Sequence, residues 1–201
     1  MTAPTIDLVL RSLNTSWSYR RWEQLPADDK RYEVIDGILY MTIAPSSFHQ
    51  WIVQRLLRLV GWPAEDQGLA YPFIAPIGVL MPGCDPVQPD FLLVRRSNGG
   101  IIADRRIRGV PDLIAEVLSP SNPEQDTEIK RGAYARAGLP EYWVIRLQTR
   151  DVLVCWQPDN ALGDFTQVRL IGPHDMLVAE TIAGVTLRVS DLFTGAPDTT
   201  L

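Results

Sequence analysis

The chain has 201 residues, of which 46% are hydrophobic and 21% charged. This length and composition are typical of one globular domain with a substantial core. No apolar run reaches the roughly 18 residues of a membrane span, and the first residues lack the basic-then-apolar order of a secretory signal. Two cysteines without metal-ligand spacing, Cys84 and Cys155, indicate reduced thiols. We therefore expect a cytoplasmic protein with no membrane segment.

The net charge of −5 bears on the choice of partner. Proteins that bind nucleic acid tightly and without sequence preference usually carry an excess of basic residues, which releases counterions from the phosphates. This chain lacks that excess, so its charge argues against tight nonspecific binding to DNA. Part of the acidic count is explained if some carboxylates hold a metal ion.

Residues 1–16 are predicted to be a flexible leader, residues 17–193 one domain and residues 194–201 a tail. Two β-rich runs, Tyr32–Ile35 and Ile38–Ile43, flank Asp36-Gly37. A two-residue Asp-Gly link between such runs predicts a hairpin, because glycine accepts the positive φ of a type I′ turn. Apolar residues then recur at helical spacing over residues 46–60, and Gly61 is predicted to end that helix.

The rest of the chain alternates strand-like and helical patterns. A helix over residues 123–137 follows an Asn-Pro start and ends at Gly138. The predicted strands are 70–80, 89–94, 111–118, 141–147, 151–157, 165–170, 176–182 and 185–189. This order predicts an α/β fold with a mixed β-sheet flanked by helices.

Three acidic residues interrupt strand patterns in which a carboxylate is costly: Glu33, Asp90 and Glu116. The strand that contains Glu116 is apolar on both faces, which indicates a central strand covered on both sides. A carboxylate buried there must be paired, hydrogen-bonded, protonated or bound to a metal, because an isolated buried charge is too unfavourable.

The helix that follows supplies a partner for these acids. Asp126, Lys130 and Tyr134 are spaced four residues apart and share one helix face. An adjacent apolar stripe would dock this helix on the sheet. We therefore expect Lys130 to lie near the end of the strand that carries Glu116.

Taken one by one, these residues leave other interpretations open. Glu33 could be a surface residue of the hairpin, and Asp90 could cap a turn after its proline. Glu116 could belong to a structural ion pair, and Lys130 could be an exposed helix lysine paired with Asp126.

The arrangement of several motifs together is more specific. They resemble the Uma2 family, over about residues 17–193 and in the family's order and spacing. The matching segments are YEVIDG at residues 32–37, PD at 89–90, PDLIAEVLSPS at 111–121, Asp126 and Lys130, and YARAGLPEYW at 134–143. That family belongs to the PD-(D/E)XK restriction-endonuclease-like superfamily.

The resemblance implies a restriction-endonuclease-like core and assigns roles to four residues. Asp90 corresponds to the aspartate of the PD element, Glu116 to the second acidic ligand and Glu33 to an auxiliary glutamate. The lysine expected two residues after the second acid is replaced by Leu118. Lys130 matches the lysine that the following helix supplies in Uma2-like proteins.

The resemblance further implies Mg²⁺ as cofactor, with Mn²⁺ as a substitute, held by Asp90, Glu116 and Glu33, because Mg²⁺ takes oxygen ligands. DNA is the implied substrate and hydrolysis of its phosphodiester bonds the implied reaction, with a homodimer as a further expectation. His49 matches a recurrent histidine, for which a substrate contact and a helix-capping role stay open. Asp126 is interpreted as positioning the lysine or stabilising the helix dipole. The rival function is a nuclease-fold protein without cleavage that binds nucleic acid or protein.

Overall fold

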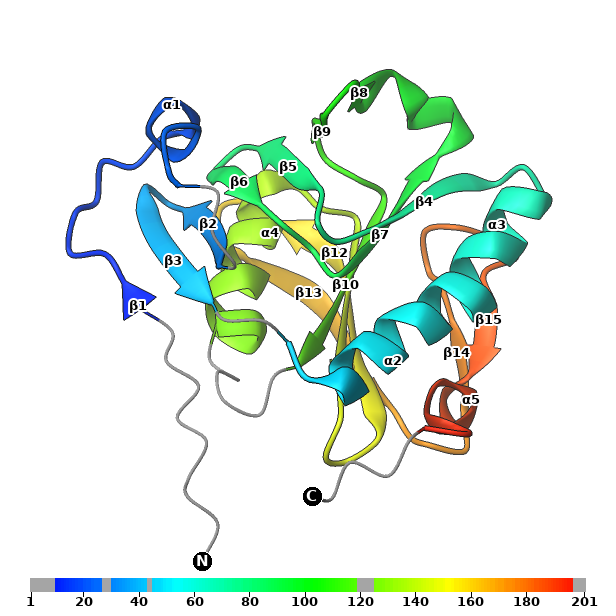
Figure 1. Cartoon of the computed structure of the whole chain (residues 1–201). Helices are drawn as coiled ribbons and strands as arrows, with labels where there is room; N and C mark the ends of the chain where they lie inside the picture. Colours follow the sequence, from blue (N-terminus) through cyan, green and yellow to red (C-terminus); the bar gives the residue numbers. More distant parts are fainter. Residues whose placement is uncertain (1–9, 27–29, 43–44, 119–124, 197–201) are drawn as a thin grey trace, which may run out of the picture.

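A computed structural model describes residues 10–26, 30–42, 45–118 and 125–196. Most strands belong to two large sheets (Figure 1), both of which contain parallel and antiparallel pairs. The seven-stranded sheet has, in spatial order, β1 (Leu10–Arg11), β3 (Ile38–Thr42), β2 (Arg31–Ile35), β6 (Cys84–Val87), β5 (Gly78–Met81), β9 (Arg106–Arg108) and β8 (Ile102–Ala103). The six-stranded sheet has β13 (Asp164–Ile171), β12 (Asp151–Asp159), β11 (Glu141–Arg146), β10 (Leu113–Leu118), β7 (Phe91–Arg95) and β4 (Ala70–Ile74). The predicted mixed α/β class is confirmed.

Helices cover both faces of the six-stranded sheet. Figure 1 shows α2 and α3 on one side of it and α4 on the other. The α-helices are α1 (Tyr19–Trp22), α2 (Ser47–Leu56), α3 (Trp62–Asp66), α4 (Arg131–Ala137) and α5 (Val189–Phe193). Leu57–Gly61 and Gln125–Lys130 form π-helical segments, and Arg96–Ile101 forms a 3₁₀ segment. A separate small sheet consists of β14 (Met176–Val178) and β15 (Thr186–Arg188). Within the described residues, no helix is long and apolar enough to span a bilayer.

The central strand β10 separates two hydrophobic cores. Leu113, Ala115 and Val117 pack with α2 and α5 on one face. Ile114 and the half-buried Leu118 pack on the other face, with α4 and with strands of the seven-stranded sheet. Because side chains alternate along a strand, Glu116 lies on this second face. The two-sided apolar pattern predicted for this strand is therefore confirmed, and Glu116 faces the space between the two sheets.

The Asp-Gly hairpin was predicted correctly. Strands β2 and β3 pair in antiparallel register from Ile35 opposite Ile38. Asp36 and Gly37 have φ angles of 50° and 74°, which are the left-handed values of a type I′ turn. The hairpin carries Glu33 on β2 opposite Tyr40 of β3, two pairs before the Ile35–Ile38 pair that closes the turn.

Two boundaries were predicted wrongly. The helix over residues 46–60 does not end at Gly61 but continues through the π-helical segment into α3, as far as Asp66. Gly61 is needed for packing, since a Cβ there would lie 2.9 Å from Leu57 and 3.0 Å from Pro72. Residues 70–80 do not form one strand but two, because β4 pairs with β7 and β5 pairs with β6 in the other sheet.

Both ends of the domain differ in detail from the prediction. Within the predicted leader, Leu10–Arg11 forms β1 and pairs with β3; Trp17, the first residue after the leader, donates its backbone N–H to the carbonyl of Gly37. The predicted strands 176–182 and 185–189 shorten to β14 and β15, and α5 follows them. The segment of residues 119–124, which includes the predicted helix start at Asn122 and Pro123, lies outside the described residues.

Candidate active site

Glu33 enters the space between the sheets from β2. Its side chain is 2% exposed, and its Oε1 atom accepts a hydrogen bond of 2.7 Å from the backbone N–H of Gln88. Ile35, two residues further along the same strand, belongs to the core between the sheets. Side chains two residues apart share one face of a strand, so Glu33 faces inward and is not a surface residue of the hairpin.

Asp90 and Glu116 lie next to each other on neighbouring strands. Asp90 directly precedes β7, and Phe91 pairs with Ala115 of β10. The backbone N–H of Val117 donates to Asp90 Oδ2 at 2.9 Å, and the backbone N–H of Asp90 lies 3.4 Å from Glu116 Oε2. Both side chains are buried. The two acids therefore occupy one neighbourhood, as the sequence predicted.

Lys130 bridges the acids of the two sheets. Its Nζ atom lies 2.9 Å from Glu116 Oε1 and 3.2 Å from Glu33 Oε2, and its side chain is 3% exposed. Tyr134, one helical turn later, donates its hydroxyl to the same Glu116 oxygen at 2.8 Å. The predicted shared helix face of Lys130 and Tyr134 therefore points at Glu116. Asp126 belongs to the π-helical segment, but its side chain lies outside the described part of the chain.

His49 and Arg31 flank the two oxygens of Asp90. His49 Nε2 lies 3.0 Å from Asp90 Oδ2, and Arg31 donates from Nη1 to Asp90 Oδ1 at 2.9 Å. The N-terminus of α2 is capped by Ser46, whose hydroxyl accepts from the backbone N–H of His49. The His49 imidazole instead points at Asp90 and plays no capping role. The sequence reasoning missed Arg31. Its position two residues before Glu33 predicts the same strand face, and this alternation could have identified it.

Opposite charges in the site shift one another's pKa values. Burial acts to raise the pKa of Asp90, but the Arg31 guanidinium and the His49 ring outweigh burial and hold that pKa well below its usual range. Burial acts to lower the pKa of Arg31, but the three surrounding carboxylates outweigh it, so the pKa lies above its ordinary value. Burial and then the charge of Glu116 raise the pKa of Tyr134. The site therefore contains an ionised Asp90, a permanent guanidinium and a neutral phenol.

Three other buried acids of the described residues lie outside this cluster and have structural partners: Glu141, Asp112 and Asp151, the last of which accepts from the Arg146 guanidinium. Glu141 accepts hydrogen bonds from the Trp143 indole, the Thr181 hydroxyl and the backbone beyond β14. Asp112 accepts from the backbone and guanidinium of Arg95. Their oxygens serve to hold loops against the sheet. Among the described side chains, the candidate site is the set Arg31, Glu33, His49, Asp90, Glu116, Lys130 and Tyr134.

The donor atoms of the cluster suit a hard divalent cation. Mg²⁺ binds carboxylate oxygens and needs only one or two carboxylates when waters complete its shell. Asp90 and Glu116 are adjacent, and the lowered pKa keeps Asp90 ionised. Within the described ranges, no three side chains of the His, Cys, Asp or Glu type are grouped so that they could hold a metal ion. The described side chains therefore suit an ion that is held by two carboxylates and water.

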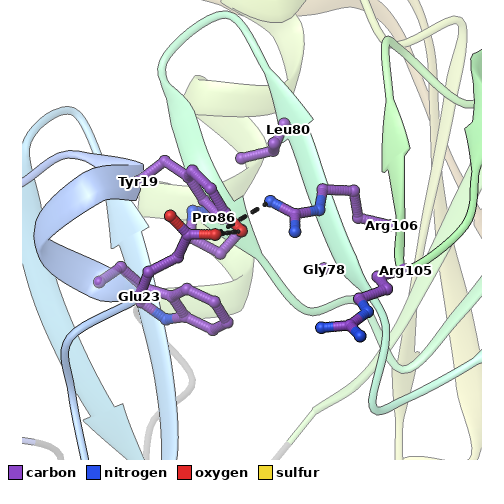
Figure 2. A pocket seen from close by; sticks show the side chains of 8 residues that line it. Tyr19, Glu23, Gly78, Leu80, Pro86, Arg105 and Arg106 are labelled. Atoms are coloured by element: carbon purple, nitrogen blue, oxygen red, sulfur yellow. Dashed lines mark hydrogen bonds and ion pairs between the residues drawn. The ribbon is translucent and has the colours of Figure 1, made fainter.

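A cavity of about 480 Å³ lies elsewhere. Figure 2 shows it between Tyr19 and Glu23 on one side and Arg105 and Arg106 on the other, with Leu80 on its wall. Because the neighbours of Leu80 on β5 belong to the core between the sheets, this cavity opens on the outer face of the seven-stranded sheet. None of the clustered carboxylates lines it, so it is separate from the candidate site.

The fold and the site together define a mixed α/β protein whose acids and lysine converge where two sheets meet. The same fold occurs in a solved structure, described as a putative nuclease belonging to DUF820 from Anabaena variabilis ATCC 29413. That protein is 18% identical, with a TM-score of 0.72 over 88% of this chain and 97% of that chain. No curated protein matches this chain. The family model of Uma2, described as "Putative restriction endonuclease", matches residues 18–190. The chain therefore belongs to the Uma2 family, as its motifs indicated.

Proposed function

We propose that this protein is a divalent-metal-dependent endodeoxyribonuclease that hydrolyses phosphodiester bonds of DNA. One observation carries the proposal: the Lys130 ammonium lies between Glu33 and Glu116, with Asp90 directly beside Glu116. An ionised aspartate, a second acid and a lysine in one buried place suit phosphoryl transfer, in which negative charge grows on the phosphate oxygens. The family description supports the same reaction class.

Each residue has a role that its contacts allow. Asp90 and Glu116 would hold Mg²⁺ or Mn²⁺ together with waters, whereas Glu33, the third acid of the predicted metal set, would hold Lys130 in place. When bound, the ion would supply charge neutralisation and a more acidic water. Lys130 would orient the attacking water or stabilise the charge on phosphorus oxygens as the new P–O bond forms and the ester P–O bond breaks. His49 would contact substrate or accept a proton through its second ring nitrogen.

The rival is a nuclease-fold protein that binds nucleic acid or protein without cleaving it. The net charge of −5 favours this rival over a nuclease, whereas the convergence of Asp90, Glu116 and Lys130 favours hydrolysis. The decisive experiment incubates the purified chain with plasmid, linear duplex and single-stranded DNA, in Mg²⁺, in Mn²⁺ and in excess chelator.

We expect cleavage that needs the divalent ion and that falls at least about 100-fold in Asp90→Asn and Glu116→Gln. Asp112→Asn is the matched control, because Asp112 is also a buried, ion-paired acid but lies outside the cluster. Cleavage that survives in both site variants would refute the assignment. The absence of cleavage, with binding retained, would establish the rival. Light scattering during size-exclusion chromatography tests the expected homodimer.

A further inference from the structure

Three buried polar atoms of the candidate site have no hydrogen-bond partner among the described residues: Arg31 Nε, Arg31 Nη2 and His49 Nδ1. They belong to the two side chains that flank Asp90. A buried donor without an acceptor is unfavourable, and more so when the group is charged. Such atoms in a site of this kind indicate that a ligand supplies the missing partner.

The two unpaired nitrogens of Arg31 lie on one edge of its guanidinium. The other end of the group is occupied, since Nη1 donates to Asp90 Oδ1 at 2.9 Å. Nη2 lies 3.6 Å from Glu33 Oε1, which is an ion-pair distance but too long for a hydrogen bond. The Nε–Nη2 edge presents two parallel N–H groups. This geometry matches two oxygens of a phosphate or carboxylate.

The charge of the site decides what kind of ligand would bind at this edge. A guanidinium attracts an anion and repels a cation, so the missing partner is an acceptor group and not a metal. A phosphodiester also has to enter a space lined by three carboxylates, which repel it. Arg31 is placed to offset that repulsion on the side of Asp90, as Lys130 is on the side of Glu116.

We propose that the Nε–Nη2 edge of Arg31 is a phosphate-binding subsite that holds two non-bridging oxygens of the substrate phosphodiester. This role rests on the proposed hydrolysis of DNA. His49 Nδ1 is also buried without a hydrogen-bond partner and would contact a water or an oxygen of the bound group. Arg31 therefore has two tasks: one end neutralises Asp90, and the adjacent edge binds substrate.

The first test needs neither catalysis nor metal. The thermal midpoint of the full chain is measured with increasing inorganic phosphate, in chelator, for the wild type, Arg31→Lys and Arg31→Gln. Arg31→Lys keeps a cation beside Asp90 and so protects the fold, but it lacks the two-pronged edge. We expect phosphate to raise the wild-type midpoint and to affect both variants much less.

Arg106→Gln is the matched control. Arg106 is 19% exposed and lies 3.6 Å from Glu23, while Arg31 is 21% exposed and lies 3.6 Å from Glu33. The phosphate response should persist in Arg106→Gln. An unchanged response in Arg31→Lys, a loss of the response in Arg106→Gln, or no response in the wild type would each overturn the proposal.

The second test compares KM and kcat for DNA. In Arg31→Lys, KM should rise about tenfold, the loss expected for one charged hydrogen bond, with a smaller change in kcat. An unchanged KM in a variant that still cleaves would refute the subsite. A wild type that responds to phosphate through Arg31 but cleaves no DNA would refute the proposed hydrolysis and leave the subsite in place.

Discussion

Replacing Lys130 by methionine removes a charge while nearly preserving side-chain length. The ammonium lies 2.9 Å from Glu116 and 3.2 Å from Glu33, and all three side chains are at most 3% exposed. Breaking a buried ion pair by removing one partner costs about 3–5 kcal/mol, because the other charge stays buried without compensation. Here two carboxylates lose the same partner, so we expect a loss in the upper part of that range. A domain of this kind has a total stability of about 5–15 kcal/mol.

The assay is urea denaturation followed by tryptophan fluorescence, which the six tryptophans of the chain allow. Lys30→Met is the control, since Lys30 is exposed and surface substitutions usually change stability by less than about 0.5 kcal/mol. In the double variant Lys130→Met with Glu116→Gln, the loss should be smaller than the sum of the single losses, because the neutral amide no longer needs the cation. A Lys130→Met protein within about 1 kcal/mol of the wild type would refute the electrostatic reasoning.

Three further predictions follow from single contacts. Tyr134→Phe removes a buried hydroxyl that donates to Glu116 and should lower the free energy of unfolding by about 1.5–3 kcal/mol in the same urea assay; an unchanged midpoint would contradict it. Gly37→Ala should lower the thermal midpoint more than Gly68→Ala does. Both positions have positive φ, but only at Gly37 would a Cβ collide with the backbone oxygen of Thr15. Equal losses in the two variants would show that φ strain alone matters. Burial acts to raise the pKa of Asp151, but the hydrogen bond from Arg146 outweighs it and the pKa is lowered. The stability from this pair is therefore present above the ordinary pKa of about 4 and lost as the pH falls through the folded-state pKa. Urea titrations should show Asp151→Asn about 1 kcal/mol less stable than the wild type at pH 7, and a difference that persists unchanged in strong acid would contradict the assignment.

Local patterns predicted the parts of the fold that local chemistry determines. Asp36-Gly37 predicted the hairpin because glycine adopts the left-handed φ without a steric penalty and aspartate adopts it more readily than most residues. The two-sided apolar pattern around Glu116 predicted a central strand, which β10 is. Helical spacing placed Lys130 and Tyr134 on the face that meets Glu116.

The errors lie where tertiary packing overrides local preference. A glycine at the end of an apolar helical pattern usually ends the helix. Here the chain stays helical through Gly61, where the absence of a Cβ lets Leu57, Pro72 and Phe91 approach closely. Pro76 and Gly78 are break signals within residues 70–80, but no local pattern shows that the first half pairs with β7 and the second half with another sheet. The unpaired edge of Arg31 was likewise hidden, because it depends on which acceptors the fold brings near.

The bridge formed by Lys130 joins an acid of one sheet to an acid of the other. The same three charges that would serve a reaction therefore also fasten the two layers of the molecule together. Natural selection for a stable fold alone would conserve them, even in a descendant that had lost all chemistry. Conservation of these residues among relatives is thus poor evidence of activity, because selection for stability and selection for catalysis would leave the same three residues in place.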